Sequence, residues 1–196
     1  MSGRTSDLIR NHAGPGSEQG DKKDALTIPE PIDPAVDHLR GPASAPLILE
    51  YGDYECPYSR RATREIQRVA AHLSGDLRFA FRHFPLTDIH PHALAAAAAA
   101  EAASLQGGFW EMHDVLFHRQ DALEDEDLRR YAGELGLDIP AFDANRISDP
   151  VLLRIERDVR SAIATGEVRG TPTIFIDGVI HGGGYDADTL LEALTR

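Results

Sequence analysis

The chain has one cysteine, fewer basic than acidic residues and no long hydrophobic run, and each shortage excludes a class of protein. Because Cys56 is the only cysteine, the chain cannot close a disulfide within itself, which excludes a structural disulfide framework. No apolar run approaches the roughly 20 residues of a membrane-spanning helix. The formal net charge of −12 argues against a nucleic-acid partner, since phosphate binding needs clustered lysine and arginine.

The N-terminal segment lacks the apolar core of a secretory signal. Together with the single cysteine, this predicts a protein of the reducing cytoplasm, although a chain trimmed of an export signal would have the same features. Residues 1–32 are rich in Gly, Ser, Asp, Lys and Pro, so we expect a flexible N-terminal tail. Residues 33–196 are long enough for one folded domain with its own core.

The first part of this domain has the pattern of strand, helix and strand. Residues 35–39 are predicted as a short edge strand, and the compact apolar run at 47–51 as a buried strand. Pro57 opens a helix that Gly75 ends. The alternation at 77–84 predicts a second strand, parallel to the first and joined to it by a crossover.

A helical insertion is predicted at about residues 88–167, before the sheet resumes. Its long segments have helical spacing or high helix propensity, and Pro140 and Pro150 mark the starts of short helices. The long segments are Ala93–Ala103, Phe109–His118, Glu124–Leu135 and Val151–Thr165.

The C-terminal part predicts a hairpin and a final helix. Thr173–Ile176 is a strand pattern, and Asp177-Gly178 is a strong two-residue turn signal that returns the chain toward His181. The last helix runs over 186–194, with Asp186 as its N-cap.

Cys56 stands where the first strand pattern gives way to the helix. A thiol at a helix N-terminus lies among unpaired backbone N–H groups, which stabilise its thiolate form and make it a nucleophile. Three positions on, where a dithiol redox site would have its second cysteine, the chain has Ser59. The alternative is that Cys56 is a small buried hydrophobic residue, as free cysteine commonly is.

This order of elements resembles the DsbA-like branch of the thioredoxin fold, an α/β fold with an inserted helical subdomain. The clear departure from the dithiol members of that family is Ser59. A chain with cysteine there would be an ordinary dithiol oxidoreductase with the same fold and site. The stretches that match the family are Glu50–Tyr58 (EYGDYECPY), Phe81–Leu86 (FRHFPL), Gly107–His113 (GGFWEMH) and Gly170–Gly178 (GTPTIFIDG).

The resemblance implies a thiol–disulfide oxidoreductase with a Cys56-Pro57-Tyr58-Ser59 site. Cys56 would attack a partner and form a mixed disulfide. Ser59 can donate a hydrogen bond to the thiolate but cannot displace a bound partner, so glutathione or a protein thiol must resolve the intermediate. The resemblance also makes Glu50 a buried acid with a raised pKa that relays protons behind the thiol. The alternative for Glu50 is an exposed position on the strand.

Pro172 corresponds in that family to a cis proline beside the thiol. The resemblance implies that Gly170, Thr171 and Pro172 bind the substrate, with the Thr171 backbone pairing with an extended peptide. The alternative is a trans proline at the start of an edge strand.

No metal and no resident cofactor are predicted, although glutathione is a possible co-substrate. His83, His90 and His92 suggest a metal site with Cys56, but their spacing matches no zinc motif. Two other functions stay open. One is a glutathione-dependent isomerase or transferase in which Ser59 or Cys56 faces bound glutathione. The other is a non-catalytic module that binds extended peptides, since a fold alone does not determine function.

Overall fold

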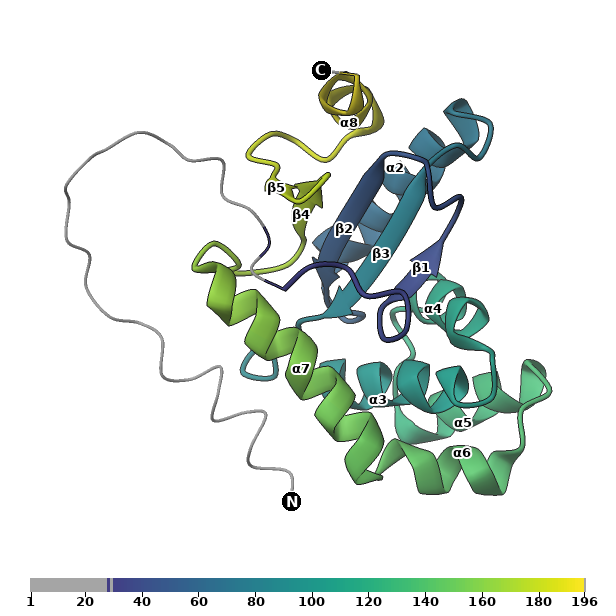
Figure 1. Ribbon diagram of the computed structural model, residues 1–196. Helices are drawn as coiled ribbons and strands as arrows, with labels where there is room; N and C mark the ends of the chain where they lie inside the picture. Colours follow the sequence, from purple (N-terminus) through teal and green to yellow (C-terminus); the bar gives the residue numbers. More distant parts are fainter. Residues whose placement is uncertain (1–27, 29, 196) are drawn as a thin grey trace.

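A mixed five-stranded sheet forms the centre of the fold (Figure 1). The structure is a computed structural model that describes residue 28 and residues 30–195. The strands lie in the order β1-β3-β2-β4-β5. Of the neighbouring strands, β2 and β3 are parallel and the other pairs are antiparallel. The strands are β1 (His38–Arg40), β2 (Leu47–Gly52), β3 (Arg78–His83), β4 (Thr173–Ile176) and β5 (Val179–Ile180).

The helices form two groups around this sheet. α2 joins β2 to β3 and packs beside the C-terminal α8, while α3 to α7 follow β3 and precede β4, where the helical insertion was predicted. In Figure 1, α3 to α6 lie together at one end of the sheet and α7 runs along it. The helices are α2 (Pro57–His72), α3 (Ala93–Ser104), α4 (Phe109–His118), α5 (Asp125–Glu134), α6 (Ile139–Arg146), α7 (Asp149–Thr165) and α8 (Ala187–Leu194).

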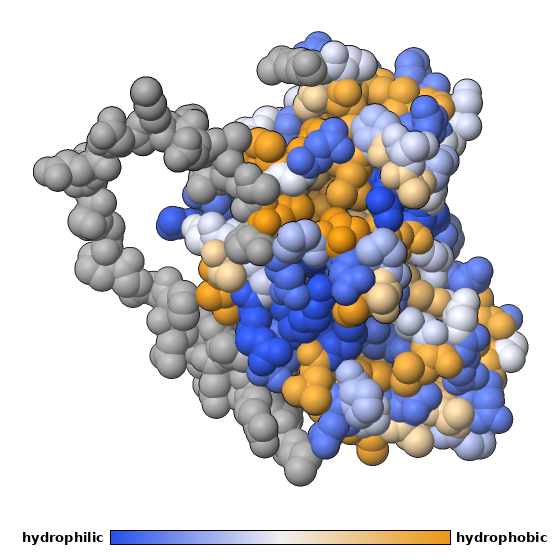
Figure 2. Space-filling view, in the orientation of Figure 1, coloured by the Kyte–Doolittle hydropathy of each residue, from blue (hydrophilic) through white to orange (hydrophobic). Residues whose placement is uncertain are grey.

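Both faces of the sheet are buried, because helices pack on each of them. Side chains alternate between the faces along each strand and so contribute to two cores. From β2 and β3, Ile48 and Phe81 join a core with α2, α3 and α4. Leu49 and Ala80 join a second core with α7. In Figure 2, hydrophilic side chains gather over α7, beside an apolar area over the strands. Within the described residues, no helix is both long enough and apolar enough to cross a membrane.

Most predicted elements are confirmed, and two differ. The first strand is His38–Arg40 rather than residues 35–39. The Asp33 side chain accepts a hydrogen bond from Ala35 N–H, and Asp37 accepts one from Asp33 N–H at 2.8 Å, which closes a turn there instead. Pro150 does not begin a separate short helix, since it lies in the first turn of the 17-residue helix α7.

The N-terminal boundary of the packed chain lies before residue 33. Of the predicted tail, residues 1–27 and 29 lie outside the described residues. Ile28 is buried, and its N–H donates to the Gly178 carbonyl at 2.9 Å, beside the β4–β5 turn. Glu30 is held as well, because its carbonyl accepts from Arg82 at 3.0 Å. These contacts place the end of the predicted tail against the sheet.

An ion pair buried on the α7 side of the sheet joins β3 to the segment before β1. Arg82 donates to both carboxylate oxygens of Asp37 at 2.9 Å, and both side chains have 0% exposure. Arg82 also donates to the Tyr51 hydroxyl at 3.0 Å. A buried guanidinium needs such partners because burial removes its water.

We expect Asp37→Ala to lower the free energy of unfolding by about 3–5 kcal/mol, because it leaves the Arg82 charge in the core without its carboxylate partner. Urea unfolding measures the difference. The matched control is Asp114→Ala, which breaks the half-exposed pair with Arg40 and should cost less than about 1 kcal/mol. Equal losses for the two variants would contradict a special role for the buried pair.

Candidate functional site

Cys56 is the N-cap of α2, as its position in the sequence predicted. Its backbone is extended, Pro57 follows in the first helical turn, and the Cys56 carbonyl accepts the hydrogen bond of Arg60 N–H at 3.1 Å. The cysteine is only 3% exposed, while Pro57 and Tyr58 are exposed, Tyr58 to 63%. The thiol therefore lies just beneath a surface formed by its own neighbours.

The Cys56 thiol meets the segment before β4 across 115 residues of sequence. Its S–H donates to the Thr171 carbonyl, with 3.3 Å between sulfur and oxygen. The Thr171–Pro172 peptide bond is cis. Gly170, Thr171 and Pro172 are half-buried, so this segment covers the sulfur from one side. Cys56 is buried, as the alternative of a small hydrophobic residue requires, but its sulfur contacts a polar backbone group close to the surface.

Ser59 lies on the buried face of α2 with no exposed surface. Its Oγ accepts a hydrogen bond from Asp53 N–H at 3.3 Å, and its hydroxyl lies close enough to the Glu50 carboxyl group to lower the pKa of that acid. Among the described residues, the Cys56 thiol donates to the Thr171 carbonyl, and no hydrogen bond joins Ser59 to the sulfur. Ser59 instead connects the start of α2 with the acid on β2.

Glu50 is fully buried, which confirms the burial expected for it and excludes the exposed alternative. Burial raises the pKa of Glu50 to about 8, and hydrogen bonds from Thr63 and Ser59 only partly oppose this shift. One oxygen, Oε2, accepts from Thr63 at 3.4 Å, while Oε1 has no protein partner. The carboxyl group is thus able to hold or release a proton near neutral pH.

Two residues that the sequence analysis did not single out hold the loop of the cysteine in place. Asp53 accepts hydrogen bonds from Glu55 N–H at 2.8 Å and from Leu86 N–H at 2.9 Å. The buried Gln120 side chain donates to the carbonyls of Tyr54, at 2.6 Å, and of Cys56, at 2.9 Å. The partners of Gln120 lie more than 60 residues away, so no local pattern could have found it.

The histidines considered for a metal site separate into different groups. His90 bonds with Asp53 at 2.7 Å, and His92 bonds with Glu55 at 2.9 Å and with Glu124 at 3.1 Å. The hydrogen bond with Glu55 raises the pKa of His92. None of these described bonds involves the sulfur of Cys56.

A groove of about 420 Å³ lies beside the cysteine, and three of its seven lining residues are acidic. The carboxylates of Glu55 and Glu124 face the His92 ring across it. The groove is lined by Glu55, Pro57, His92, Gln120, Asp121, Leu123 and Glu124.

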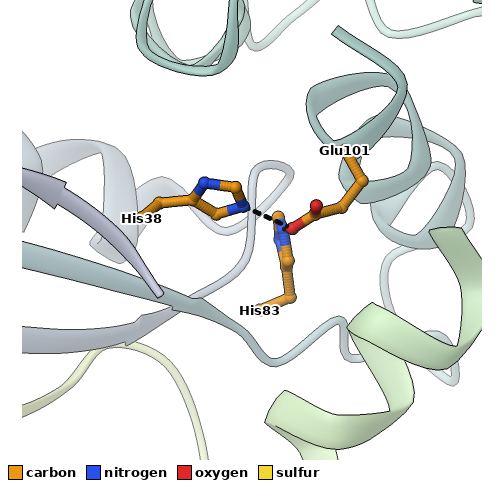
Figure 3. Close-up of side chains that lie close together, drawn as sticks. All are labelled: His38, His83 and Glu101. Carbon is orange, nitrogen blue, oxygen red and sulfur yellow. Dashed lines mark hydrogen bonds and ion pairs between the residues drawn. The ribbon is translucent and has the colours of Figure 1, made fainter. Parts of the chain in front are cut away.

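His83 lies apart from His90 and His92, with His38 and Glu101 (Figure 3). The Nε2 atoms of both histidines lie 2.8 Å from Glu101 Oε1. Burial disfavours the charge of Glu101, but the hydrogen bonds from His38 and His83 outweigh it and hold the pKa of this carboxyl well below its usual range. The sequence analysis did not consider this combination.

Comparison with known proteins identifies relatives of the whole folded region. A protein-family model described as Thioredoxin matches residues 35–196. Among solved structures, a thioredoxin-like oxidoreductase from Silicibacter pomeroyi aligns with a TM-score of 0.73 and 26% identity over 90% of this chain and 97% of that one. The oxidised BdbD of Bacillus subtilis aligns with 0.71 and 21% over 82% and 92%, and Wolbachia pipientis alpha-DsbA1 with 0.71 and 22% over 87% and 94%.

Curated relatives share more sequence but are much longer proteins. A protein of Mycolicibacterium vanbaalenii named Na(+)/H(+) antiporter NhaA 1 is 48% identical over 172 residues, which is 86% of this chain and 28% of that protein. A protein of Herminiimonas arsenicoxydans named Na(+)/H(+) antiporter NhaA is 46% identical over 86% of this chain and 27% of its own length. The chain therefore spans little more than a quarter of these relatives.

We expect Glu50→Gln to change how stability depends on pH. The folded-state pKa of Glu50, about 8, lies above the ordinary value of 4.5, so the folded state holds this proton more tightly than the unfolded chain. The contribution of Glu50 to stability is full below about pH 4.5 and is lost as the pH rises through about 8. Glu50→Gln should therefore gain on the order of a few kcal/mol relative to the wild type over that window.

Urea unfolding of both proteins at several pH values measures this gain. The exposed Glu126→Gln serves as the control and should parallel the wild type. If the unfolding free energy of Glu50→Gln, plotted against pH, also ran parallel to that of the wild type, the raised pKa of Glu50 would be wrong.

Proposed function

The chain belongs to the thioredoxin family, with the fold of its DsbA-like thiol–disulfide oxidoreductases, and on this premise we propose that it exchanges disulfides through Cys56 alone. The predicted α/β fold, a thioredoxin-like fold with an inserted helical subdomain, is confirmed. The observation that carries the proposal is the position of the Cys56 sulfur at the N-terminus of α2, against the Thr171 carbonyl.

In the proposed reaction, the Cys56 thiolate attacks one sulfur of a partner's disulfide. A new sulfur–sulfur bond forms between Cys56 and the partner, the partner's own bond breaks, and its second sulfur leaves as a thiolate that takes up a proton. The buried Glu50 carboxyl group, with its pKa raised to about 8, supplies a proton reservoir behind the site. In this proposal the Ser59 hydroxyl, which lowers the pKa of Glu50, relays that proton toward the helix N-terminus.

Substrate binding in this proposal uses the segment that covers the sulfur. A partner in extended conformation adds its backbone along Gly170 and Thr171, next to Pro172. A partner N–H that donates to the Thr171 carbonyl competes with the Cys56 S–H for the same acceptor. Peptide binding thereby breaks the hydrogen bond that the Cys56 thiol makes to the Thr171 carbonyl in the free protein. The exposed Tyr58 ring offers an apolar surface to the same partner.

Resolution of the mixed disulfide requires a thiol from outside the chain, because Ser59 cannot form a disulfide. A second thiolate, from glutathione or from a protein, attacks the Cys56–partner bond, and Cys56 leaves as a thiolate. The proposed co-substrates are therefore small or protein thiols, with no resident cofactor, and a reducing cytoplasm would supply them.

We expect the wild type to accumulate a mixed disulfide with a peptide disulfide when no other thiol is present. Intact-mass analysis should show one peptide per chain, and Cys56→Ala should show none. Ser59→Cys supplies a thiol within reach, so its adduct should decay at least ~10²-fold faster, leaving a disulfide inside the chain. A wild type that forms no adduct while its denatured chain reacts would contradict the proposal.

The rate at which glutathione releases the peptide from this adduct tests glutathione as the resolving thiol. We expect a rate that rises in proportion to the glutathione concentration, because thiol exchange here needs no prior binding step. Rapid mixing, acid quenching at set times and intact-mass analysis measure the rate, and dithiothreitol serves as the reference thiol. A rate that saturates at micromolar glutathione would indicate a noncovalent glutathione site and would favour a transferase instead.

A further inference from the structure

We propose that His38, His83 and Glu101 form a binding site for one divalent transition-metal ion, separate from the site of Cys56. The three side chains come from β1, β3 and α3 and point toward one another (Figure 3). Their donor atoms all lie within 4.8 Å of one another. Each of the two imidazoles directs its Nε2 at the same carboxylate oxygen, at 2.8 Å.

The donor set has the chemistry that zinc and similar ions prefer. Two neutral imidazoles and one carboxylate are a known zinc set that leaves a fourth position for water. Hydrogen bonding alone would allow the two N–H groups to divide between both oxygens of Glu101, since a carboxylate accepts at each. Instead, both histidines converge on Oε1. When each neutral imidazole carries its proton on Nδ1, the two Nε2 lone pairs therefore point at the place that this oxygen occupies.

The distances leave room for an ion after a small movement. With bonds of about 2.1 Å, a tetrahedral ion separates neighbouring donor atoms by roughly 3.4 Å. The two observed nitrogen–oxygen separations of 2.8 Å would therefore open by about half an ångström through movement of the Glu101 side chain. The two imidazole nitrogens, which lie within 4.8 Å of each other, would settle at a similar spacing.

The surroundings hold the ligands, and His38 is the most exposed of the three. The His38 ring is stacked on Phe109 with 3.4 Å between ring centroids, which fixes its orientation. The side chains of His83 and Glu101 are 1% and 6% exposed, whereas that of His38 is 12% exposed. An ion would enter past His38. Once bound, it would join the sheet to the first helix of the insertion and stabilise the folded state.

Zinc titration of the full chain, without an affinity tag and after chelator treatment, tests the site. Calorimetry should find one Zn²⁺ per chain, and thermal unfolding should shift upward as zinc is added. His38→Phe keeps an aromatic ring on Phe109 but removes the Nε2 ligand, so its zinc affinity should fall at least tenfold. Glu101→Gln keeps an acceptor for the histidines but loses the charge, and should weaken zinc binding likewise.

Two controls separate this site from other zinc ligands. Cys56→Ala removes the thiol and His118→Ala removes an exposed histidine, and both should bind zinc like the wild type. Cobalt replaces zinc as a spectroscopic probe and should give the visible absorption of a four-coordinate ion. Circular dichroism checks that each variant folds. If Glu101→Gln does not fold, the zinc affinity of His38→Phe decides whether the proposal stands. Wild-type affinity in His38→Phe, loss of binding in Cys56→Ala, or no binding at millimolar zinc would overturn the proposal.

Discussion

The antiparallel pairing of β2 with β4 is the constraint on which the site depends. Because the strands run in opposite directions, the end of β2 lies beside the start of β4, with Tyr51 opposite Thr173. The loop that leaves β2 carries Cys56, and the loop that enters β4 carries Thr171 and Pro172. The contact between the sulfur and the Thr171 carbonyl follows from this pairing, although more than a hundred residues separate the two loops.

The same strand brings an acid beneath the helix. Glu50 faces the α2 side of β2, so its carboxyl group meets Thr63 and Ser59 on the buried face of that helix. A polar group is expensive to bury without full hydrogen bonding, and Glu50 Oε1 has no protein partner. The buried carboxyl group stays protonated, and therefore uncharged, up to about pH 8. That state is also what a proton reservoir for a nearby thiol requires.

Local pattern was enough to predict most of the strands and helices and the position of Cys56, because each depends on neighbours in sequence. The hairpin turn at Asp177-Gly178 is confirmed, with positive φ at both residues, since its residue types demand that geometry. Asp53 and Gln120 could not be found in this way. Their roles depend on partners that only the folded chain brings near, as does the grouping of His38 with Glu101. The turn that displaces β1 is local, made by Asp33 with Ala35 and Asp37, and its Asp signal was missed in the sequence.

The replacement of a resolving thiol by Ser59 has a consequence for the timing of the proposed reaction. In a dithiol site, the second sulfur removes the partner within the same molecule, so the partner leaves quickly. With a hydroxyl at that place, buried and hydrogen-bonded to Asp53 N–H, the lifetime of the intermediate depends on thiols outside the chain. The partner stays attached through its disulfide with Cys56, and the surface around Cys56 has to accommodate it for that whole period. The half-buried segment 170–172, the exposed Tyr58 and the groove next to Pro57 are features that contact with such a partner can use.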